Sequence, residues 1–375
     1  MLRVLLATPV PPPHHGGIIN WTRIIRRELG PRSGIELTFV DTAARYRAVT
    51  NTFLPLRLVG GSAQAIRDTY RLRRRLKADR PDLVHLCTSG GLATPKDIMI
   101  LRIARAFGVP GVIHYRMGRL PNIALRSGVE WKLTRRAMSL ADAVITLDKR
   151  SEACVKAALP DGFVVTLPNI IEMDVIDQVR NREVSRPPPP APSGRIVYVG
   201  HVIPTKGIRE LVEACTRFSG RTPVLELVGP GGRRFQSQLK GTASSRAETD
   251  WLHFHGSVDH EQALRHILAA DLFVLPSYTE GAPNVVLEAM GCGKAILSTP
   301  VGAVPEMLDI GGPEECGVCV ESHNTDALYD AMQRLLDDED KRRELGRKAR
   351  ARAERLYAAP VACDKLLDLW QSVAK

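Results

Sequence analysis

Two glutamates, Glu280 and Glu288, flank a turn that joins an apolar run to an expected helix. The run 272–275 is typical of a buried strand, and residues 284–290 are typical of a helix. Free N–H groups at this helix start, together with the helix dipole, favour an anion or a sugar hydroxyl. Since a carboxylate accepts paired hydrogen bonds from vicinal hydroxyls, one glutamate could hold a sugar ring and the other a ribose. The spacing alone is equally compatible with a plain helix start, where the dipole favours an acidic residue.

A loop lysine and a pair of glycines are further candidates for anion binding. Lys206 follows the apolar run 195–199 and offers a compact positive charge. Gly16 and Gly17 follow the first apolar run, and a glycine backbone can approach a phosphate closely because it has no Cβ. Taken singly, the lysine is also compatible with a solvated loop and the glycines with an ordinary turn.

In the sequence, these candidates directly follow apolar runs, and such runs alternate with helical stretches along the whole chain. Strands are expected at residues 3–8, 81–86, 111–115, 143–147, 195–199, 224–228, 252–256, 272–275 and 295–298. Helices are expected at residues 18–29, 96–107, 129–139, 208–218, 284–290, 326–336, 340–356 and 361–373. Apolar runs without alternation indicate parallel strands buried on both faces, and ligands of such sheets bind at the carboxyl ends of the strands. The pattern therefore predicts an α/β protein.

A proline-rich segment at residues 186–193 is expected to be an extended linker, because it can continue neither a helix nor a central strand. The charge balance changes there: residues 1–185 hold 29 Lys and Arg against 16 Asp and Glu, and the remainder holds 23 against 25. We therefore predict two domains, residues 1–185 and 194–358. Residues 359–375 are expected to form a separate C-terminal helix.

Composition excludes several classes of protein. With 44% hydrophobic and 25% charged residues, the chain is expected to be globular rather than disordered. Its seven cysteines do not indicate a disulfide framework, and the Cys316–Cys319 pair lacks the partners of a metal or redox site. The first residues do not resemble a signal peptide, and no run is long enough to span a bilayer, so a cytoplasmic location is expected.

The block from Pro276 to Met290 resembles the Glu-x7-Glu motif of retaining glycosyltransferases with the GT-B fold, the family-4 type. Other segments are similar to that family's motifs in the same order, over nearly the whole chain: residues 15–17, 168–169, 199–207 and 301–306. The resemblance implies a GT-B architecture, in which two Rossmann-like domains face a cleft and the C-terminal helix crosses back to the first domain. It implies a nucleotide-sugar donor on the second domain and an acceptor that enters from the first.

The resemblance also implies roles for single residues. Glu280 would hold the donor sugar near its anomeric carbon, Lys206 would stabilise the leaving diphosphate, and Glu288 would bind the ribose. The implied catalytic residues are Glu280, Lys206, His114 and Arg116. The implied donor-binding residues are Gly16, Gly17, His201, Lys206, Gly229, Val258, Glu280, Gly281, Ala282, Pro283, Asn284, Val285 and Glu288. The family needs no bound metal and no cofactor besides the donor substrate, and no Asp-x-Asp motif is placed here as a metal clamp.

Three positions depart from the family pattern. His201 stands where the family has a diphosphate-binding arginine, and Ile170 replaces the glycine of a Pro-Asn-Gly segment. Arg116 occupies the usual place of a catalytic-site histidine, and His114 lies two residues earlier, on the same face of the expected strand. Either side chain could therefore enter the site, and His114 is equally compatible with an ordinary strand histidine.

A basic stretch in the first half is compatible with a solvated helix face or with a surface that attracts anionic lipid heads. It contains Arg67, Arg71, Arg73, Arg74, Arg75 and Lys77. We expect a retaining glycosyltransferase that acts on a glycan or lipid-linked acceptor in cell-surface polysaccharide or glycolipid synthesis, peripheral to the inner membrane. A sugar-nucleotide epimerase or hydrolase of the same fold, an inactive transferase, and a basic non-enzyme that binds nucleic acid or membranes remain alternatives. Because the basic stretch lacks interleaved aromatics and a nucleic-acid motif, a nucleic-acid partner is not expected.

Overall fold

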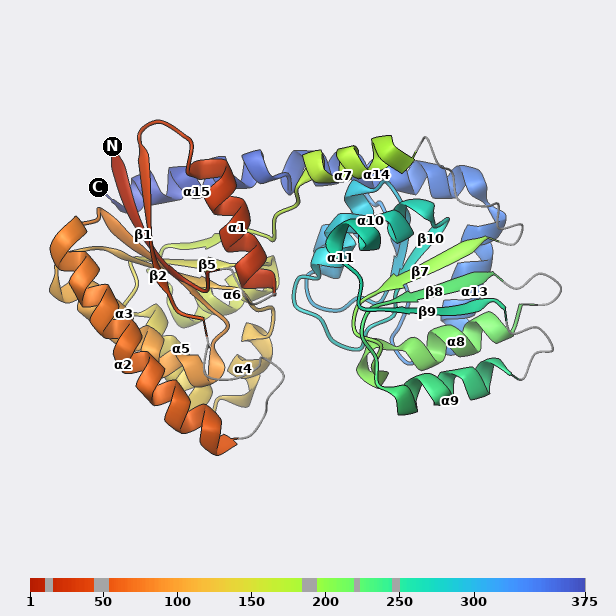
Figure 1. The fold of residues 1–375 in the computed structure, drawn as a ribbon, viewed down its shortest axis with the longest axis horizontal. Coiled ribbons are helices and arrows are strands. Elements are labelled where there is room, and N and C mark those ends of the chain that lie inside the picture. Colours follow the sequence, from red (N-terminus) through yellow and green to blue (C-terminus); the bar gives the residue numbers. More distant parts are fainter. Residues whose placement is uncertain (11–15, 44–53, 184–193, 219–222, 245–249, 375) are drawn as a thin grey trace. The chain divides into compact units, whose positions relative to one another are not determined.

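The computed structural model describes residues 1–10, 16–43, 54–183, 194–218, 223–244 and 250–374. The chain divides into two units (Figure 1): Met1–Ile170 together with Ala359–Lys375, and Ile171–Ala358. This division differs from the boundary expected at residues 185 and 194. Helix α7 (Met173–Glu183) packs on α10 (His260–Ala269) and α11 (Asn284–Gly291), and so belongs to the second unit. The proline-rich segment 186–193 lies outside the described residues.

The first unit is a parallel sheet of six strands in the order β2-β1-β3-β4-β5-β6. Its strands are β1 (Leu2–Thr8), β2 (Ile35–Asp41), β3 (Leu83–Thr88), β4 (Gly111–Tyr115), β5 (Ala143–Thr146) and β6 (Val164–Thr166). Its helices are α1 (Gly17–Leu29), α2 (Leu54–Asp79), η1 (Gly91–Ala93), α3 (Thr94–Ala106), α4 (Leu120–Arg126), α5 (Val129–Met138), α6 (Lys149–Ala158) and α15 (Ala359–Val373).

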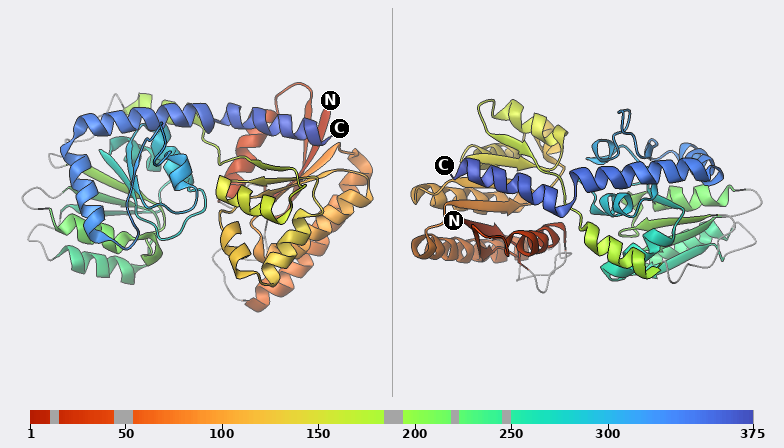
Figure 2. Two further views of the ribbon diagram at one scale, coloured as in Figure 1. Left: turned by 180° about the vertical axis from the view of Figure 1, so that it is seen from behind. Right: turned by 90° about the horizontal axis from the view of Figure 1, so that it is seen from above.

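Helices cover both faces of this sheet, as Figure 2 shows from two further sides. One core contains residues of α2, α3, α5 and α6, such as Leu72 and Leu101. The other contains residues of α1 and α15, such as Ile24 and Trp370. Strands between two apolar layers must be apolar on both faces, which is why β3 and β4 are buried at every position.

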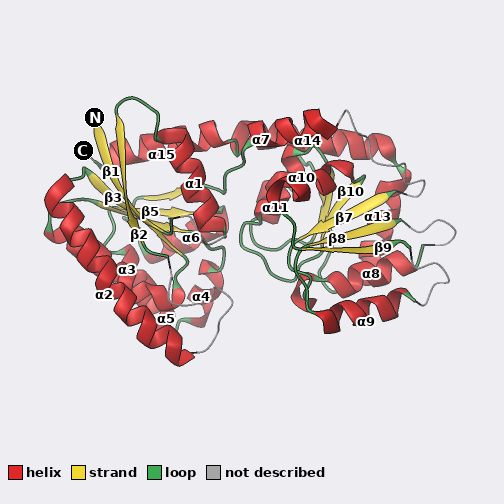
Figure 3. Cartoon of the chain, in the orientation of Figure 1, coloured by secondary structure: helices red, strands yellow, loops and turns green. Residues whose placement is uncertain are grey.

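The second unit is another parallel sheet of six strands, in the order β12-β11-β10-β7-β8-β9. Figure 3 labels β10, β7, β8 and β9 of this sheet. Its strands are β7 (Arg195–Val199), β8 (Val224–Val228), β9 (Leu252–Gly256), β10 (Leu272–Leu275), β11 (Ala295–Ser298) and β12 (Val318–Cys319). Besides α7, α10 and α11, its helices are η2 (Pro204–Lys206), α8 (Ile208–Thr216), α9 (Arg233–Ala243), α12 (Val304–Met307), α13 (Thr325–Asp337) and α14 (Glu339–Leu356).

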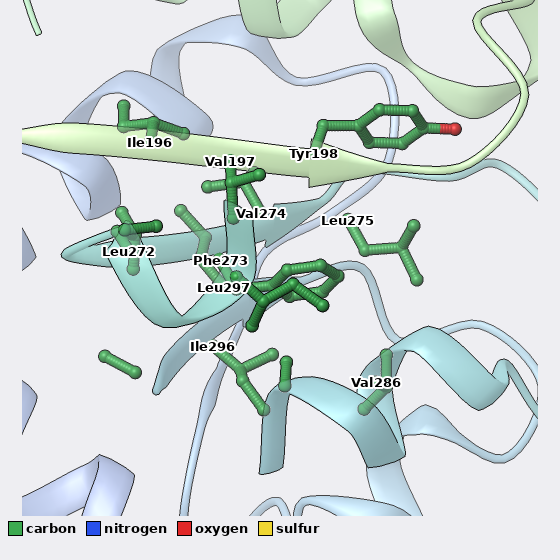
Figure 4. Close-up of a cluster of buried hydrophobic side chains, with 14 of the residues drawn as sticks. Ile196, Val197, Tyr198, Leu272, Phe273, Val274, Leu275, Val286, Ile296 and Leu297 are labelled. Carbon is green, nitrogen blue, oxygen red and sulfur yellow. The ribbon is translucent and has the colours of Figure 1, made fainter. Parts of the chain in front are cut away.

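The core of the second unit fixes the strands that carry the expected site loops. Figure 4 shows side chains of β7, β10, β11 and α11 gathered in this core. Phe273 and Val286 are fully buried there, so both β10 and the helix that follows it are anchored by apolar contacts. The expected strands 111–115, 195–199, 224–228, 252–256, 272–275 and 295–298 match the observed ones, and both units have the Rossmann-like α/β character that the sequence predicts.

Within the described residues, no helix is both long and apolar enough to cross a membrane. Cys316 is buried and donates to the carbonyl of Leu308, while Cys319 lies on β12. Both cysteines are free thiols.

Candidate functional site

The expected site loops of the second unit follow β7, β8, β9, β10 and β11. Because all the strand pairs are parallel, these loops leave from one edge of the sheet. Backbone hydrogen bonds join neighbouring loops: Tyr278 N donates to Thr205 O at 3.1 Å, and Ala303 N donates to Gly281 O at 2.7 Å. The topology thereby brings together segments that are far apart in the sequence.

Lys206 and Glu280 form an ion pair at this edge. Lys206 Nζ lies 2.6 Å from Glu280 Oε1, and the side chains are only 22% and 14% exposed. The pair depends on a close backbone approach, because Gly207 has φ 67° and a Cβ on it would lie 2.0 Å from Pro276 O. Only glycine permits this contact between the loop after β7 and the loop after β10.

Helix α11 presents its first turn beside Glu280. Its cap residue is Pro283, no side chain caps it, and its first turn contains no acidic residue. Asn284 Oδ1 and Ser277 Oγ are buried without a hydrogen-bond partner among the described residues. The positive end of the helix and these unpaired oxygens together can take a ligand that carries both negative charge and hydroxyl groups.

Glu288 lies one turn into α11 and contacts a residue that the sequence did not indicate. Its Oε1 is 3.0 Å from His260 Nε2, at the start of α10, and Glu288 is 19% exposed. The contact spans 28 positions, so no local signal could have found His260.

The sequence patterns also did not single out two tyrosines that lie beside the ion pair. Tyr198 OH donates to His201 O at 2.9 Å, and burial, with Glu280 nearby, raises the pKa of Tyr198 well above its ordinary value. Tyr278 OH donates to Glu210 Oε1 at 2.5 Å, and the Tyr278 ring stacks on His323 at 3.6 Å. Tyr278 lies inside the Glu280 loop, where an aromatic residue between Ser277 and Glu280 was an available signal.

The remaining expected donor residues lie at the same edge with different exposures. His201 is exposed, whereas Val258 is partly buried against the core after β9. Gly229 is packed so closely that a Cβ on it would lie 2.0 Å from Gly200 O. The other residues of the loop after β10, which run from Gly281 to Val285, are partly or fully buried.

In the first unit, Gly16 and Gly17 are exposed at the start of α1. Gly16 is the cap residue, Asn20 N donates to Gly16 O at 3.0 Å, and the first turn has no acidic residue. The two glycines are in a different unit from Lys206.

His114 and Arg116 contact each other at the end of β4. Arg116 Nη1 lies 3.2 Å from His114 Nε2, and Arg116 Nη2 donates to Asn169 Oδ1 at 2.7 Å. His114 is 1% exposed and His85 is fully buried, whereas Arg116 is partly buried with its guanidinium 5.3 Å over the Trp21 ring. His114 is thus an interior residue, and Arg116 is the more accessible of the two.

Burial sets the charges of this group. It lowers the pKa of His85 to about 3 and the pKa of His114 well below its ordinary value, and the charge of Arg116 acts in the same direction. Burial lowers the pKa of Arg116 to about 10. At neutral pH both imidazoles are therefore neutral and the guanidinium is charged.

Two groups of described residues place candidate metal-ligand atoms within 4.8 Å of one another: His85, Cys87 and His114, and Glu226, His255 and His266. Burial raises the pKa of Cys87 to about 12, so its sulfur stays a thiol at neutral pH. In the second group Glu226 is already paired, with His266 Nδ1 at 2.5 Å and with Arg195. Neither group includes a residue of the loops around Lys206 and Glu280.

Comparison with known proteins gives matches over most of the chain. Residues 180–352 match the family model described as glycosyl transferases group 1. The D-inositol 3-phosphate glycosyltransferase of Arthrobacter sp. (strain FB24) is 25% identical over 306 residues, which cover 77% of this chain and 70% of that protein.

Two solved structures show the same fold. Sucrose-phosphate synthase from Thermosynechococcus elongatus has a TM-score of 0.79 at 19% identity and covers 99% of both chains. Anabaena Alr3699/HepE in complex with UDP has a TM-score of 0.71 at 16% identity, over 99% of this chain and 100% of that one. The two Rossmann-like units therefore have the GT-B fold.

Proposed function

We propose that the donor of this protein is a nucleoside diphosphate sugar and that the transfer retains the anomeric configuration of the sugar. The chain belongs, through residues 180–352, to the glycosyl transferases group 1 family and is a glycosyltransferase. The observation that carries the proposal is the Lys206–Glu280 ion pair beside the first turn of α11. This arrangement combines a cation, helix N–H groups and a carboxylate, which suit a diphosphate joined to a sugar.

Each part of this arrangement has a chemical role in the proposed transfer. Lys206 and the N-terminal turn of α11 stabilise the negative charge that collects on the diphosphate as it leaves. Glu280 accepts hydrogen bonds from hydroxyls of the donor sugar, and Glu288 accepts them from the ribose. The diphosphate bound by the UDP complex of Anabaena Alr3699/HepE, a protein of the same fold, supports this assignment.

The bond changes balance without a cofactor. The acceptor hydroxyl oxygen bonds to the anomeric carbon on the face from which the diphosphate departs, and the glycosidic carbon–oxygen bond breaks. A phosphate oxygen of the leaving group takes the hydroxyl proton. The products are the glycoside and the nucleoside diphosphate, and the side chains only position and stabilise charge.

The proposal is tested first by ligand binding. UDP-, GDP- and ADP-glucose are each added to the full chain, and the one that is a donor is expected to raise the unfolding temperature, because a ligand that binds only the folded state stabilises it. The donor found in this way is then supplied with a glycan or polyprenyl-linked acceptor, and the anomeric configuration of the product is read by NMR.

Variants separate transfer from folding. Glu280→Ala is expected to abolish transfer with an unchanged unfolding temperature, while Glu339→Ala on α14, whose side chain is 63% exposed, leaves transfer unchanged. A rate of transfer by Glu280→Ala equal to that of wild type would contradict the proposal. Product formed from the donor alone would indicate an epimerase or a hydrolase, and an inverted product would refute retention.

We further propose that α2 places the enzyme at an anionic membrane surface, where a lipid-linked acceptor for cell-surface glycan synthesis would lie. Its exposed residues include Arg67, Arg71, Arg73, Arg74, Arg75 and Lys77. Beside them Ile66 and Tyr70 are 67% and 64% exposed, so the helix offers apolar side chains within a basic surface. Each basic residue near an anionic surface contributes about 1 kcal/mol.

The membrane proposal is tested by sedimentation with vesicles of phosphatidylglycerol and phosphatidylcholine at low salt. The charge reversals R71E and R74E together should reduce vesicle binding at least tenfold. R343E and R347E, on exposed positions of α14, provide the matched control. Binding that neither pair changes would refute the role of α2.

A further inference from the structure

A chain of four side chains crosses the interior of the first unit. Trp370 Nε1 lies 2.9 Å from His85 Nδ1, and His85 Nε2 lies 3.3 Å from His114 Nδ1. His114 Nε2 in turn lies 3.2 Å from Arg116 Nη1. Trp370 and His85 are fully buried and His114 is 1% exposed, so these three side chains have almost no contact with bulk solvent.

The N–H donors of these four side chains outnumber their acceptor nitrogens. A neutral imidazole has one N–H and one acceptor nitrogen, while an indole and a guanidinium only donate. The two histidines therefore provide two acceptors for three contacts. One of the three contacts must bring two N–H donors face to face.

We assign the mismatch to the Arg116 end, because Arg116 is the one member of the group that is only partly buried. The indole N–H of Trp370 is fully buried, and its contact with His85 Nδ1 is the shortest of the three. Losing that hydrogen bond would leave a buried donor unpaired, which proteins avoid. Arg116 is only partly buried and also donates to Asn169. If Trp370 donates to His85 Nδ1, then His85 carries its hydrogen on Nε2. We assign the hydrogen of His114 to Nε2 as well, so that His85 Nε2–H donates to His114 Nδ1.

Two donors consequently converge on one point, His114 Nε2–H and Arg116 Nη1–H. The charge of Arg116 also lacks a carboxylate: among the described residues no ion pair includes it, and its Nε is buried without a partner. A guanidinium that is partly removed from water is stable only when an acceptor satisfies it, and its planar arrangement of donors fits the two oxygens of a carboxylate or phosphate.

We propose that Arg116 and His114 bind an anionic group of the sugar substrate, either the carboxylate of a uronic acid or the phosphate of a sugar phosphate. An oxygen between the two donors would accept from both and remove the mismatch. The assignment of the anion to a sugar rests on the proposed function. Trp370 and His85 are positioning residues, since they fix which nitrogen of His114 bears the hydrogen.

The proposal is tested by calorimetric titration of the full chain with glucuronate, glucose 6-phosphate and glucose, each with and without UDP. One of the two charged sugars is expected to bind at least tenfold more tightly than glucose, and which one it is identifies the carboxylate or the phosphate. Equal affinities for all three sugars, or no binding of any, would overturn the inference.

Variants assign the preference to Arg116. R116Q should reduce the ratio of charged to neutral sugar affinity at least tenfold, and R116K should restore part of it. R119Q is the matched control, because Arg119 lies three residues away, is 51% exposed and is paired with Glu130. A ratio that R116Q and R119Q change alike would overturn the role of Arg116. Should R116Q fail to fold, R116K is compared with R119Q instead, and a smaller loss of the ratio is then expected, because lysine keeps the charge but not the planar pair of donors.

The role of Trp370 has a spectroscopic test. Imidazole nitrogen shifts in wild type should show His114 as the Nε2–H tautomer, and Trp370→Phe should convert it to a mixture and weaken anion binding. An unchanged tautomer in Trp370→Phe would refute the positioning role. If wild type binds UDP but shows no preference for charged sugars, only this inference is rejected. If wild type does not bind UDP, the proposed function itself is contradicted.

Discussion

Substitutions of Lys206 and Glu280 should have opposite effects on diphosphate binding, although each should abolish transfer. Lys206 Nζ donates to Glu280 Oε1 at 2.6 Å, and the two side chains are 22% and 14% exposed. A diphosphate must compete with Glu280 for this ammonium group. Lys206→Met removes the cation, whereas Glu280→Gln removes its competitor and keeps the shape of the side chain.

The size of the first effect follows from the contact. A hydrogen bond to a charged group contributes about 1.5–3 kcal/mol, so Lys206→Met should weaken the binding of a nucleoside diphosphate about 10- to 150-fold. Glu280→Gln should leave that affinity unchanged or raise it, because a neutral amide holds the ammonium less strongly than a carboxylate does. Transfer should fail in both variants, since the sugar loses a carboxylate partner in one and the leaving group loses its cation in the other.

The assay is calorimetric titration of UDP, together with the initial rate of transfer and the unfolding temperature of each variant. Lys341→Met, a substitution of a lysine on α14 whose side chain is 47% exposed, is the control for loss of one positive charge. The double variant completes the cycle and gives the coupling between the two side chains.

Two outcomes would refute this reasoning. UDP affinity that Lys206→Met leaves within twofold of wild type means that Lys206 serves only the fold. Equal weakening by Glu280→Gln and Lys206→Met means that the pair acts as one unit, without competition between carboxylate and diphosphate.

Three further predictions concern buried charge and close packing. Burial lowers the pKa of His85 to about 3, so between pH 3 and 6.5 the unfolded chain binds more protons than the folded one. Acidification through this range should therefore lower the free energy of unfolding, measured with urea, by up to about 5 kcal/mol. Burial raises the pKa of Asp97 to about 6, so its contribution falls as pH rises from 3.8 to 6, and Asp97→Asn should add up to about 3 kcal/mol at pH 8. Gly229→Ala, whose Cβ would meet Gly200 O at 2.0 Å, should separate two site loops and weaken UDP binding at least tenfold in the same titration.

Each of these three has a contradicting result, and the first and third also have a control variant. His85→Gln should flatten the acid dependence, while His253→Gln, at an exposed position, should not; equal slopes in wild type and His85→Gln would reject the first. Asp97→Asn that is no more stable than wild type at pH 8 would reject the second. For the third, Gly241→Ala on α9 has open space around its Cβ, and wild-type UDP affinity in both glycine variants would count against the close packing.

Local patterns were sufficient to predict most elements of the second unit. The run 272–275 is apolar at every position and is followed by a loop and a helix start, so both the strand and the place of Glu280 and Glu288 follow from neighbouring residues. The boundary between the units was misplaced because proline content and charge mark a segment that cannot be regular structure. They do not show which core the preceding helix α7 joins.

The contacts in the candidate sites join residues that are far apart in the sequence. Lys206 and Glu280 are 74 positions apart, and Trp370 reaches His85 across 285. The sequence by itself determined two α/β units, the loops that carry the charged residues, and the helix start after Glu280, because strand and helix periodicity and turn chemistry are local. Only the tertiary structure decided that Lys206 lies against Glu280 and that Arg116 contacts His114, because strand order and burial set which loops and side chains meet.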